Sequence, residues 1–371
     1  MKNPIGFLYK TTLLGFLSSV FICFKLWHNS RTFPTIPVFS FLPSLTVPLN
    51  FVLLGLLIAL LIAALFVNRP GLFIPVILGL TGLLVLEDIN RLQPEFYIFS
   101  MLLFLVYLHA CNKVEEEKLF LIFRILISAI YIFTGLNKIN ACFFINVYGP
   151  MINKLQGVLP APGYSLLSSL SFLIPAMEIG TGIAIWIPKL KKISFFLAAA
   201  FHLSILMMLG PLVLNSNYSV FPWNICMVVF VFVLYKHQTG YGLLKSMKDN
   251  RYVQAALVLF VLVPSSHFLN LAGSFVSFDV YSGKYGYTYV FIPEDMYPKL
   301  PEYIKHYAIK NDNEHGDYRV YLDDWAGGEI KAPIFYDDWV LRRFRSYFSR
   351  YASEVSVEVV VMRNNEEKLL Q

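Results

Sequence analysis

The stretch "LFLIFRILISAIYIFTGLNKIN" (residues 119–140) decides how the rest of the chain is interpreted. Residues 119–136 are almost entirely apolar and long enough to cross a lipid bilayer as a helix. Lys138 then follows where the chain is expected to leave the membrane. Such a lysine is either a snorkelling anchor or a base held at the edge of a membrane cavity.

The composition supports a membrane protein. The 371 residues are 57% hydrophobic and 15% charged, with a mean hydropathy of +0.59. Soluble globular domains carry about 25% charged residues. We therefore predict an all-α polytopic membrane helix bundle with a small C-terminal extracytoplasmic α+β domain.

Apolar runs predict about nine transmembrane helices. They cover about residues 5–26, 49–67, 71–86, 96–112, 119–136, 165–187, 193–214, 220–235 and 252–272. With the N-terminus inside, cytoplasmic segments hold twelve Lys and Arg residues and outer segments before the tail hold five. This bias predicts a cytoplasmic N-terminus and an extracytoplasmic C-terminal domain.

The predicted domain boundary separates a transmembrane helical domain, 1–273, from the extracytoplasmic domain, 274–371. The second domain holds 12 basic and 16 acidic residues, so nucleic acid binding is not expected. Strands are predicted at 287–292, 318–322 and 355–362, with helices beginning at Pro301 and Asp337. The four cysteines form no C-x-x-C pair, and neither a disulfide framework nor a metal site is predicted.

The helix at 337–351 alternates arginines with aromatic residues. One interpretation places it at the outer membrane surface, where basic and aromatic side chains meet lipid headgroups. The alternative is an ordinary amphipathic helix packed on its own sheet.

Two ionisable residues fall near the middle of predicted membrane helices. Glu178 lies in "PAMEIGTGIAIW" and His202 in "AAAFHLSILMM". Charged groups in lipid are costly, so both are expected to face the bundle interior, where they could approach each other. They either bridge helices structurally or contact a ligand. Small residues beside Glu178 permit close helix contact in either case.

Further polar candidates lie near the predicted outer membrane surface. "LEDINRLQPEFY" (86–97) carries Asp88, Arg91, Gln93 and Glu95, and Asp88 and Arg91 could pair at i, i+3. This segment is interpreted as a solvated loop or as a polar lid over an outward-facing cavity. Asn224 lies about one turn inside its helix and needs a hydrogen-bond partner there.

Three motifs resemble a known membrane family. "YIFTGLNKIN" is similar to the Tyr-x-x-small-Gly-x-x-Lys element of the vitamin K-dependent γ-carboxylase-like family, also called the horizontally transferred transmembrane (HTTM) domain family. "AMEIGTGIAI" and "AAAFHLSILMM" resemble its later Glu and His helices, and Asp88, Arg91, Gln93 and Pro94 resemble an element of its bacterial relatives.

The resemblance covers about residues 5–275 and implies nine membrane helices with an extracytoplasmic C-terminus. It also implies a quinone as cofactor, with Lys138 as the base that deprotonates its reduced form. The family's double lysine is Asn137-Lys138 here, and the tail is short, so glutamate carboxylation is not carried over. We expect either a carboxylase-like membrane protein with a quinone- or lipid-binding cavity, or a non-catalytic membrane partner in export or maturation of a secreted protein.

The sequence alone does not decide whether the protein is an enzyme. A transporter fits less well, because no inverted repeat is visible. The reaction, the substrate and the oligomeric state do not follow from these motifs.

Overall fold

The computed structural model describes residues 3–42, 45–156, 159–210, 218–237, 243–279, 281–311, 317–351, 358–364 and 366–370. These residues form two compact units. The first comprises residues 1–22, 55–82 and 93–282, and the second comprises 23–54, 83–92 and 283–371. The second unit combines residues 23–54 and 83–92 with the C-terminal part of the chain, so the two units do not follow one division of the sequence. The predicted domain boundary after residue 273 therefore stays a prediction.

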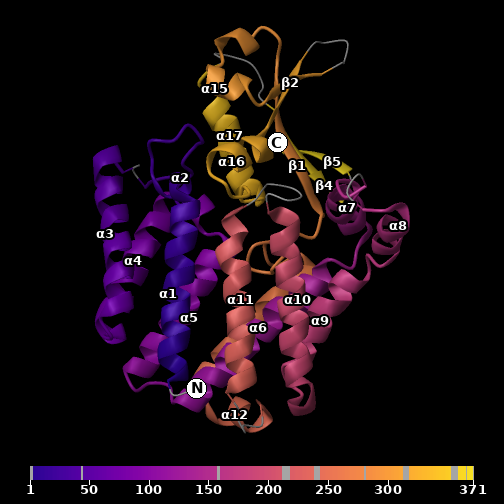
Figure 1. Ribbon diagram of the computed structural model, residues 1–371. Helices are drawn as coiled ribbons and strands as arrows, with labels where there is room; N and C mark the ends of the chain where they lie inside the picture. Colours follow the sequence, from indigo (N-terminus) through magenta and orange to yellow (C-terminus); the bar gives the residue numbers. More distant parts are fainter. Residues whose placement is uncertain are drawn as a thin grey trace. The chain divides into compact units, whose positions relative to one another are not determined.

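Among its described residues, the regular secondary structure of the first unit is entirely helical (Figure 1). Its longer helices are α1 (Pro4–Ile22), α5 (Pro94–Ala110), α6 (Glu116–Asn137), α9 (Leu173–Ala184), α10 (Lys191–Leu209) and α11 (Phe221–Lys236). Shorter helices are η2 (Phe143–Tyr148), α7 (Gly149–Asn153), α8 (Ala161–Ser169), η3 (Pro188–Leu190), η4 (Tyr218–Val220), α12 (Leu243–Asp249), α13 (Arg251–Leu257), η5 (Val258–Leu262), α14 (Val263–Ser266) and η6 (His267–Leu269).

Helix α6 is the central element of this unit. It packs against α9, α5, α11 and α13, while α1 packs against α5 and α11. Most α6 side chains are buried, including Arg124, Tyr131 and Asn137. A helix that is apolar and buried nearly all round is the core of a bundle.

Seven helices among the described residues are long and apolar enough to cross a membrane, and an eighth is possible if the pair α8 and α9, bent by 54°, forms one span. Two of the seven are α3 (Val47–Phe66) and α4 (Pro70–Glu87), which run through both units. The predicted helix at 96–112 is present as the shorter α5. The fold is thus mainly helical, as predicted.

Several predicted bounds require correction. The first helix ends at Ile22 instead of residue 26, and a separate turn, α2 (Phe24–Trp27), follows. Helix α10 ends at Leu209, and residues 211–217, where the prediction extended it, lie outside the described residues.

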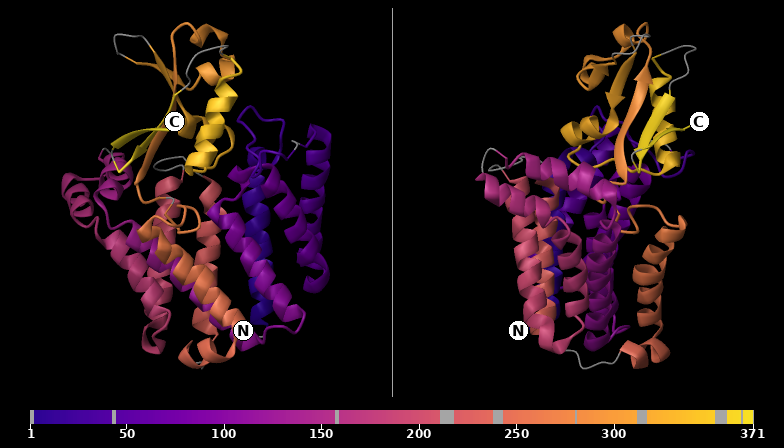
Figure 2. Two further views of the ribbon diagram at one scale, coloured as in Figure 1. Left: turned by 180° about the vertical axis from the view of Figure 1, so that it is seen from behind. Right: turned by 90° about the vertical axis from the view of Figure 1, so that its right-hand side faces the viewer.

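The second unit contains a five-stranded antiparallel sheet with the order β2-β3-β1-β4-β5 (Figure 2). Its elements are η1 (Ile89–Arg91), β1 (Tyr285–Ile292), η7 (Tyr297–Lys299), α15 (Glu302–Lys305), β2 (Ala308–Lys310), β3 (Tyr318–Tyr321), α16 (Leu322–Glu329), α17 (Asp338–Phe348), β4 (Glu358–Arg363) and β5 (Glu366–Leu370). The central strand β1 pairs Val290 with Val320 on one side and with Val359 on the other.

The predicted α+β character of the tail agrees with this sheet, but two strands were not predicted. Strand β2 occupies the end of the predicted helix at Pro301, which in fact stops at Lys305. Strand β5 is the charged edge segment Glu366–Leu370, whose composition does not favour a strand. Pairing with β3 and β4 overrides the weak local preference at both edges.

Helix α17 packs on this sheet against β4 and β5. Its apolar residues Val340, Leu341, Phe344 and Phe348 are all buried. The structure therefore shows the alternative of an amphipathic helix packed on its own sheet. Lipid contact through the exposed arginines stays a prediction.

Candidate functional site

Two glycines bring helices α6 and α9 close together. A methyl group added at Gly135 would lie 2.9 Å from the Pro175 carbonyl oxygen, and one at Gly182 would lie 2.9 Å from the Ser128 carbonyl oxygen. The Ser128 hydroxyl donates a 2.6 Å hydrogen bond to the Gly182 carbonyl oxygen. Small residues that let helix backbones approach are typical of membrane helix packing.

This close approach sets up an ion pair between the two helices. Lys138 follows the last residue of α6, and its Nζ lies 2.7 Å from Oε1 and 2.8 Å from Oε2 of Glu178 on α9. The Glu178 side chain is 4% exposed and that of Lys138 is 13% exposed. The interior location predicted for Glu178 is confirmed.

The ion pair changes the interpretation of Lys138. The close partner of Lys138 is a carboxylate, which the sequence did not indicate. An ammonium group has three N–H donors, and Glu178 accepts from two of them. Lys138 thus has a carboxylate as its close partner, and its role as a membrane anchor or as a base stays a prediction.

A second buried polar group joins α6, α10 and α11. His202 Nε2 lies 2.7 Å from the Tyr131 hydroxyl, and its Nδ1 lies 2.7 Å from Oδ1 of Asn224. All three side chains are buried, which confirms the interior location predicted for His202 and supplies the partner expected for Asn224. Glu178 and His202, which we expected could meet, instead contact different residues.

The hydrogen bonds assign the His202 tautomer. Nδ2 of Asn224 donates to the Val220 carbonyl oxygen at 2.7 Å, so the Asn224 oxygen faces His202 as an acceptor. In a neutral ring, Nδ1 of His202 therefore carries the proton, and Nε2 accepts from the Tyr131 hydroxyl. The network joins three helices through partners within the protein, and a ligand contact at His202 or Asn224 stays a prediction.

A cavity of about 90 Å³ lies in the first unit beside Lys138. Its walls come from α5, α6, α11 and the segment after η6. The lining residues are Gln93, Pro94, Glu95, Ile98, Ile130, Thr134, Lys138, Val220, Trp223, Phe278, Tyr281 and Ser282. Three polar residues singled out in the sequence, Gln93, Glu95 and Lys138, thus line one cavity.

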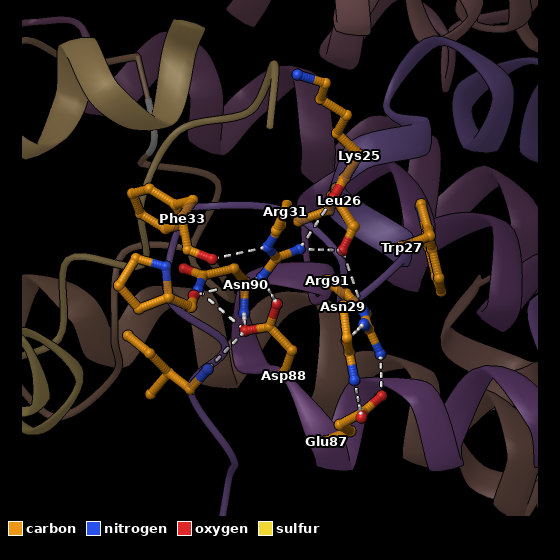
Figure 3. Close-up of polar contacts among 12 residues, drawn as sticks. Lys25, Leu26, Trp27, Asn29, Arg31, Phe33, Glu87, Asp88, Asn90 and Arg91 are labelled. Atoms are coloured by element: carbon orange, nitrogen blue, oxygen red, sulfur yellow. Dashed lines mark hydrogen bonds and ion pairs between the residues drawn. The ribbon is translucent and has the colours of Figure 1, made fainter. Parts of the chain in front are cut away.

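Asp88 and Arg91 belong to a separate network in the second unit (Figure 3). Arg91 donates 2.8 Å to Glu87 Oε2 and 2.7 Å to Asn29 Oδ1, and Asp88 pairs with Arg31. The expected Asp88–Arg91 ion pair is wrong, because Arg91 bonds the carboxylate one turn earlier.

The network explains why this segment is not a solvated loop. Asp88, Asn90 and Arg91 have no solvent exposure, and Glu87 is 4% exposed. Arg91 also donates to the carbonyl oxygens of Leu26 and Leu84, so its guanidinium ties three chain segments together. These residues hold the fold of the second unit, and the proposed lid stays a prediction.

Sequence reasoning missed the partners that complete these networks. The missed partners of Asp88 and Arg91 are Glu87, Arg31 and Asn29. Glu87 is also near them in sequence, whereas Arg31 and Asn29 are distant in sequence. Tyr131 was quoted in the family-like motif without a role. Tyr131 lies seven residues before Lys138 and so on the same helix face, and this spacing was the available signal that it has a role in the site.

Comparison with known proteins gives no relative: no family model, curated protein or solved structure matches this chain. Within the parts of the chain described above, no group of three or more His, Cys, Asp or Glu side chains could hold a metal ion. Functional conclusions therefore rest on the geometry of the cavity.

Proposed function

We propose that this chain is a multi-pass integral membrane protein that binds the polar head of a quinone or another lipid in the cavity beside Lys138. Seven apolar helices of membrane length support insertion, and the excess of cytoplasmic Lys and Arg supports an extracytoplasmic C-terminus. Nine spans result if α5 and the bent pair α8 and α9 also cross the membrane.

One observation carries this proposal: Lys138 lines the cavity while two of its donors are fixed by Glu178. No acceptor for the third N–H is found among the described residues, so it can donate to a carbonyl or hydroxyl oxygen of a ligand. The apolar wall residues Ile98, Ile130 and Phe278 suit the ring or chain attached to such an oxygen.

The pair also supplies an acid–base route. Lys138 passes one proton to Glu178, which leaves a neutral amine beside a carboxylic acid. The amine then takes the proton of a ligand hydroxyl, so that the ligand becomes an anion next to a lysine cation. A low-dielectric site strengthens this final ion pair.

Exchange of Lys138 for arginine tests this chemistry. Arginine retains the charge and pairs with a carboxylate through two hydrogen bonds, but it cannot release a proton in a protein. We expect Lys138→Arg to fold at normal levels and to fail to restore the phenotype of a deletion strain. Full restoration would refute the proton transfer and favour an accessory role in maturation of a secreted protein.

Ligand binding is measured separately. Gentle detergent extraction followed by mass spectrometry should find one retained quinone or lipid per chain. Lys138→Gln, which lacks the third ammonium donor and the ion pair, should lose that ligand. Equal retention by the wild type and this variant would refute the cavity as the binding site.

A further inference from the structure

Glu95 gives the cavity a second polar side, one that Lys138 does not use. This residue lies in the first turn of α5, lines the cavity and is 7% exposed. Its carboxylate accepts a hydrogen bond from its own backbone N–H. No other side chain among the described residues donates to it, although a carboxylate offers about four acceptor positions.

The charges around the cavity do not balance. The Lys138 charge is offset by Glu178, which holds it through two hydrogen bonds. Lys138 is the one Lys or Arg among the described lining residues, and it is already paired with Glu178, not with Glu95. A buried carboxylate without a partner is costly, so a cation or an N–H donor in the cavity is the ligand that stabilises it most.

Aromatic residues form the other walls near this carboxylate. Trp223, Phe278 and Tyr281 line the same cavity, and Trp223 is held by an edge-on contact with Phe99. Aromatic rings attract ammonium groups through their quadrupole, by about 2 kcal/mol when the site is desolvated. A carboxylate combined with several aromatic rings is a typical ammonium-binding set.

We propose that the cavity binds a primary ammonium group, carried by a small amine or by an aminoethyl lipid headgroup, with Glu95 as its anionic partner. This inference rests on the proposed function and specifies its ligand class. An oxygen of the same ligand, as in an ethanolamine unit, would accept the remaining N–H of Lys138. The two sides of the cavity then recognise the two ends of one headgroup.

Hydrogen bonding favours a primary over a trimethylated ammonium. A primary ammonium offers N–H donors to Glu95, which a trimethylammonium group lacks.

The test measures binding to the full chain in detergent by calorimetry. The probes are dihexanoyl phosphatidylethanolamine, phosphatidylcholine and phosphatidylglycerol, together with free ethanolamine and choline. We expect the ethanolamine lipid to bind at least tenfold tighter than the other two lipids. Ethanolamine without acyl chains separates the sources: binding of equal strength indicates a free amine, and weaker binding indicates a lipid headgroup.

Variants then assign the selectivity to Glu95. Glu95→Gln retains shape and removes the charge, so the tenfold preference should disappear. Glu302→Gln is the matched control, because that carboxylate side chain is 88% exposed in the second unit. If Glu95→Gln does not fold, the comparison of the three lipids on the wild type still decides.

Two results would overturn this inference: equal affinity of the three lipids for the wild type, or an unchanged preference in a folded Glu95→Gln variant. If binding is unselective but lost in Lys138→Gln, the ammonium site is refuted and the lipid cavity stands. If no probe binds and Lys138→Gln retains the same lipids as the wild type, both proposals are wrong.

Discussion

The contact between α6 and α9 predicts opposite outcomes for two glycines on the same helix. At Gly182, an added methyl group would lie 2.7 Å from Cγ1 of Ile132 and 2.9 Å from the Ser128 carbonyl oxygen. At Gly180, no atom lies within 4 Å of the added methyl group. Since a backbone oxygen cannot move without its helix, Gly182→Ala must push α9 away from α6.

The magnitude follows from two opposing effects. Overpacking a tight interface costs about 1–3 kcal/mol. Replacing a glycine inside a helix by alanine gains roughly 0.5–1 kcal/mol. Gly180→Ala has only the gain in helix-forming preference, whereas Gly182→Ala also has the overpacking cost. The free energies of unfolding of the two variants should therefore differ by that cost, about 1–3 kcal/mol. The helix-forming preference cancels in this comparison because both positions lie within α9.

The assay is reversible unfolding of the full chain in mixed micelles, followed by circular dichroism. Gly182→Ala is expected to unfold at the lower denaturant fraction and Gly180→Ala at or above the wild-type value. The Trp186 indole should also report the shift, because its N–H donates 2.8 Å to the Ser128 hydroxyl that bonds Gly182. Equal stability of the two variants, within about 0.5 kcal/mol, would refute the close packing on which the Lys138–Glu178 pair depends.

Three further predictions concern the second unit and the topology. Burial raises the pKa of Asp323 from 3.8 to about 6, so the stability that its protonated form contributes is complete below pH 4 and lost as the pH rises through 6. Hydrogen exchange of β1 should therefore show a loss of about 3 kcal/mol in the free energy of unfolding over this pH range, and Asp323→Asn should remove that loss. Arg91→Lys should destabilise this unit by about 3–5 kcal/mol in chemical unfolding, because one ammonium cannot replace four hydrogen bonds; an unchanged midpoint would contradict the role of the network. A reporter fused after residue 371 should be active only outside the cytoplasm, and cytoplasmic activity would mean a miscounted span.

The helical part of the fold could be predicted because apolar runs long enough to cross a bilayer leave few alternatives to a helix. The run at 119–136 is recovered as α6, extended at its start to Glu116. Strands β2 and β5 could not be predicted, because they are short or charged and depend on pairing with β3 and β4. Their structure is set by neighbours distant in sequence, and a local pattern does not contain that information.

The same limit applies to the candidate site. Sequence position gives the depth of Glu178 and His202 in their helices, and depth alone made them plausible neighbours. It does not give the rotation of each helix about its axis, which decides that Glu178 meets Lys138 while His202 meets Tyr131. The two glycines of the α6–α9 contact were the missing information, because they fix which faces touch.

The Lys138–Glu178 ion pair and the Glu95 carboxyl illustrate how a buried group that holds the fold differs from one that is available to a ligand. A buried polar group that exists only to hold helices together has its partners within the protein, as His202 does with Tyr131 and Asn224. Arg91, with four acceptors, is of the same kind. Lys138 has a donor to spare and Glu95 lacks a side-chain partner among the described residues, and both line one cavity. Unused hydrogen-bonding capacity at a shared cavity is what a ligand would fill, so these two residues are the ones whose exchange should change binding before it changes the fold.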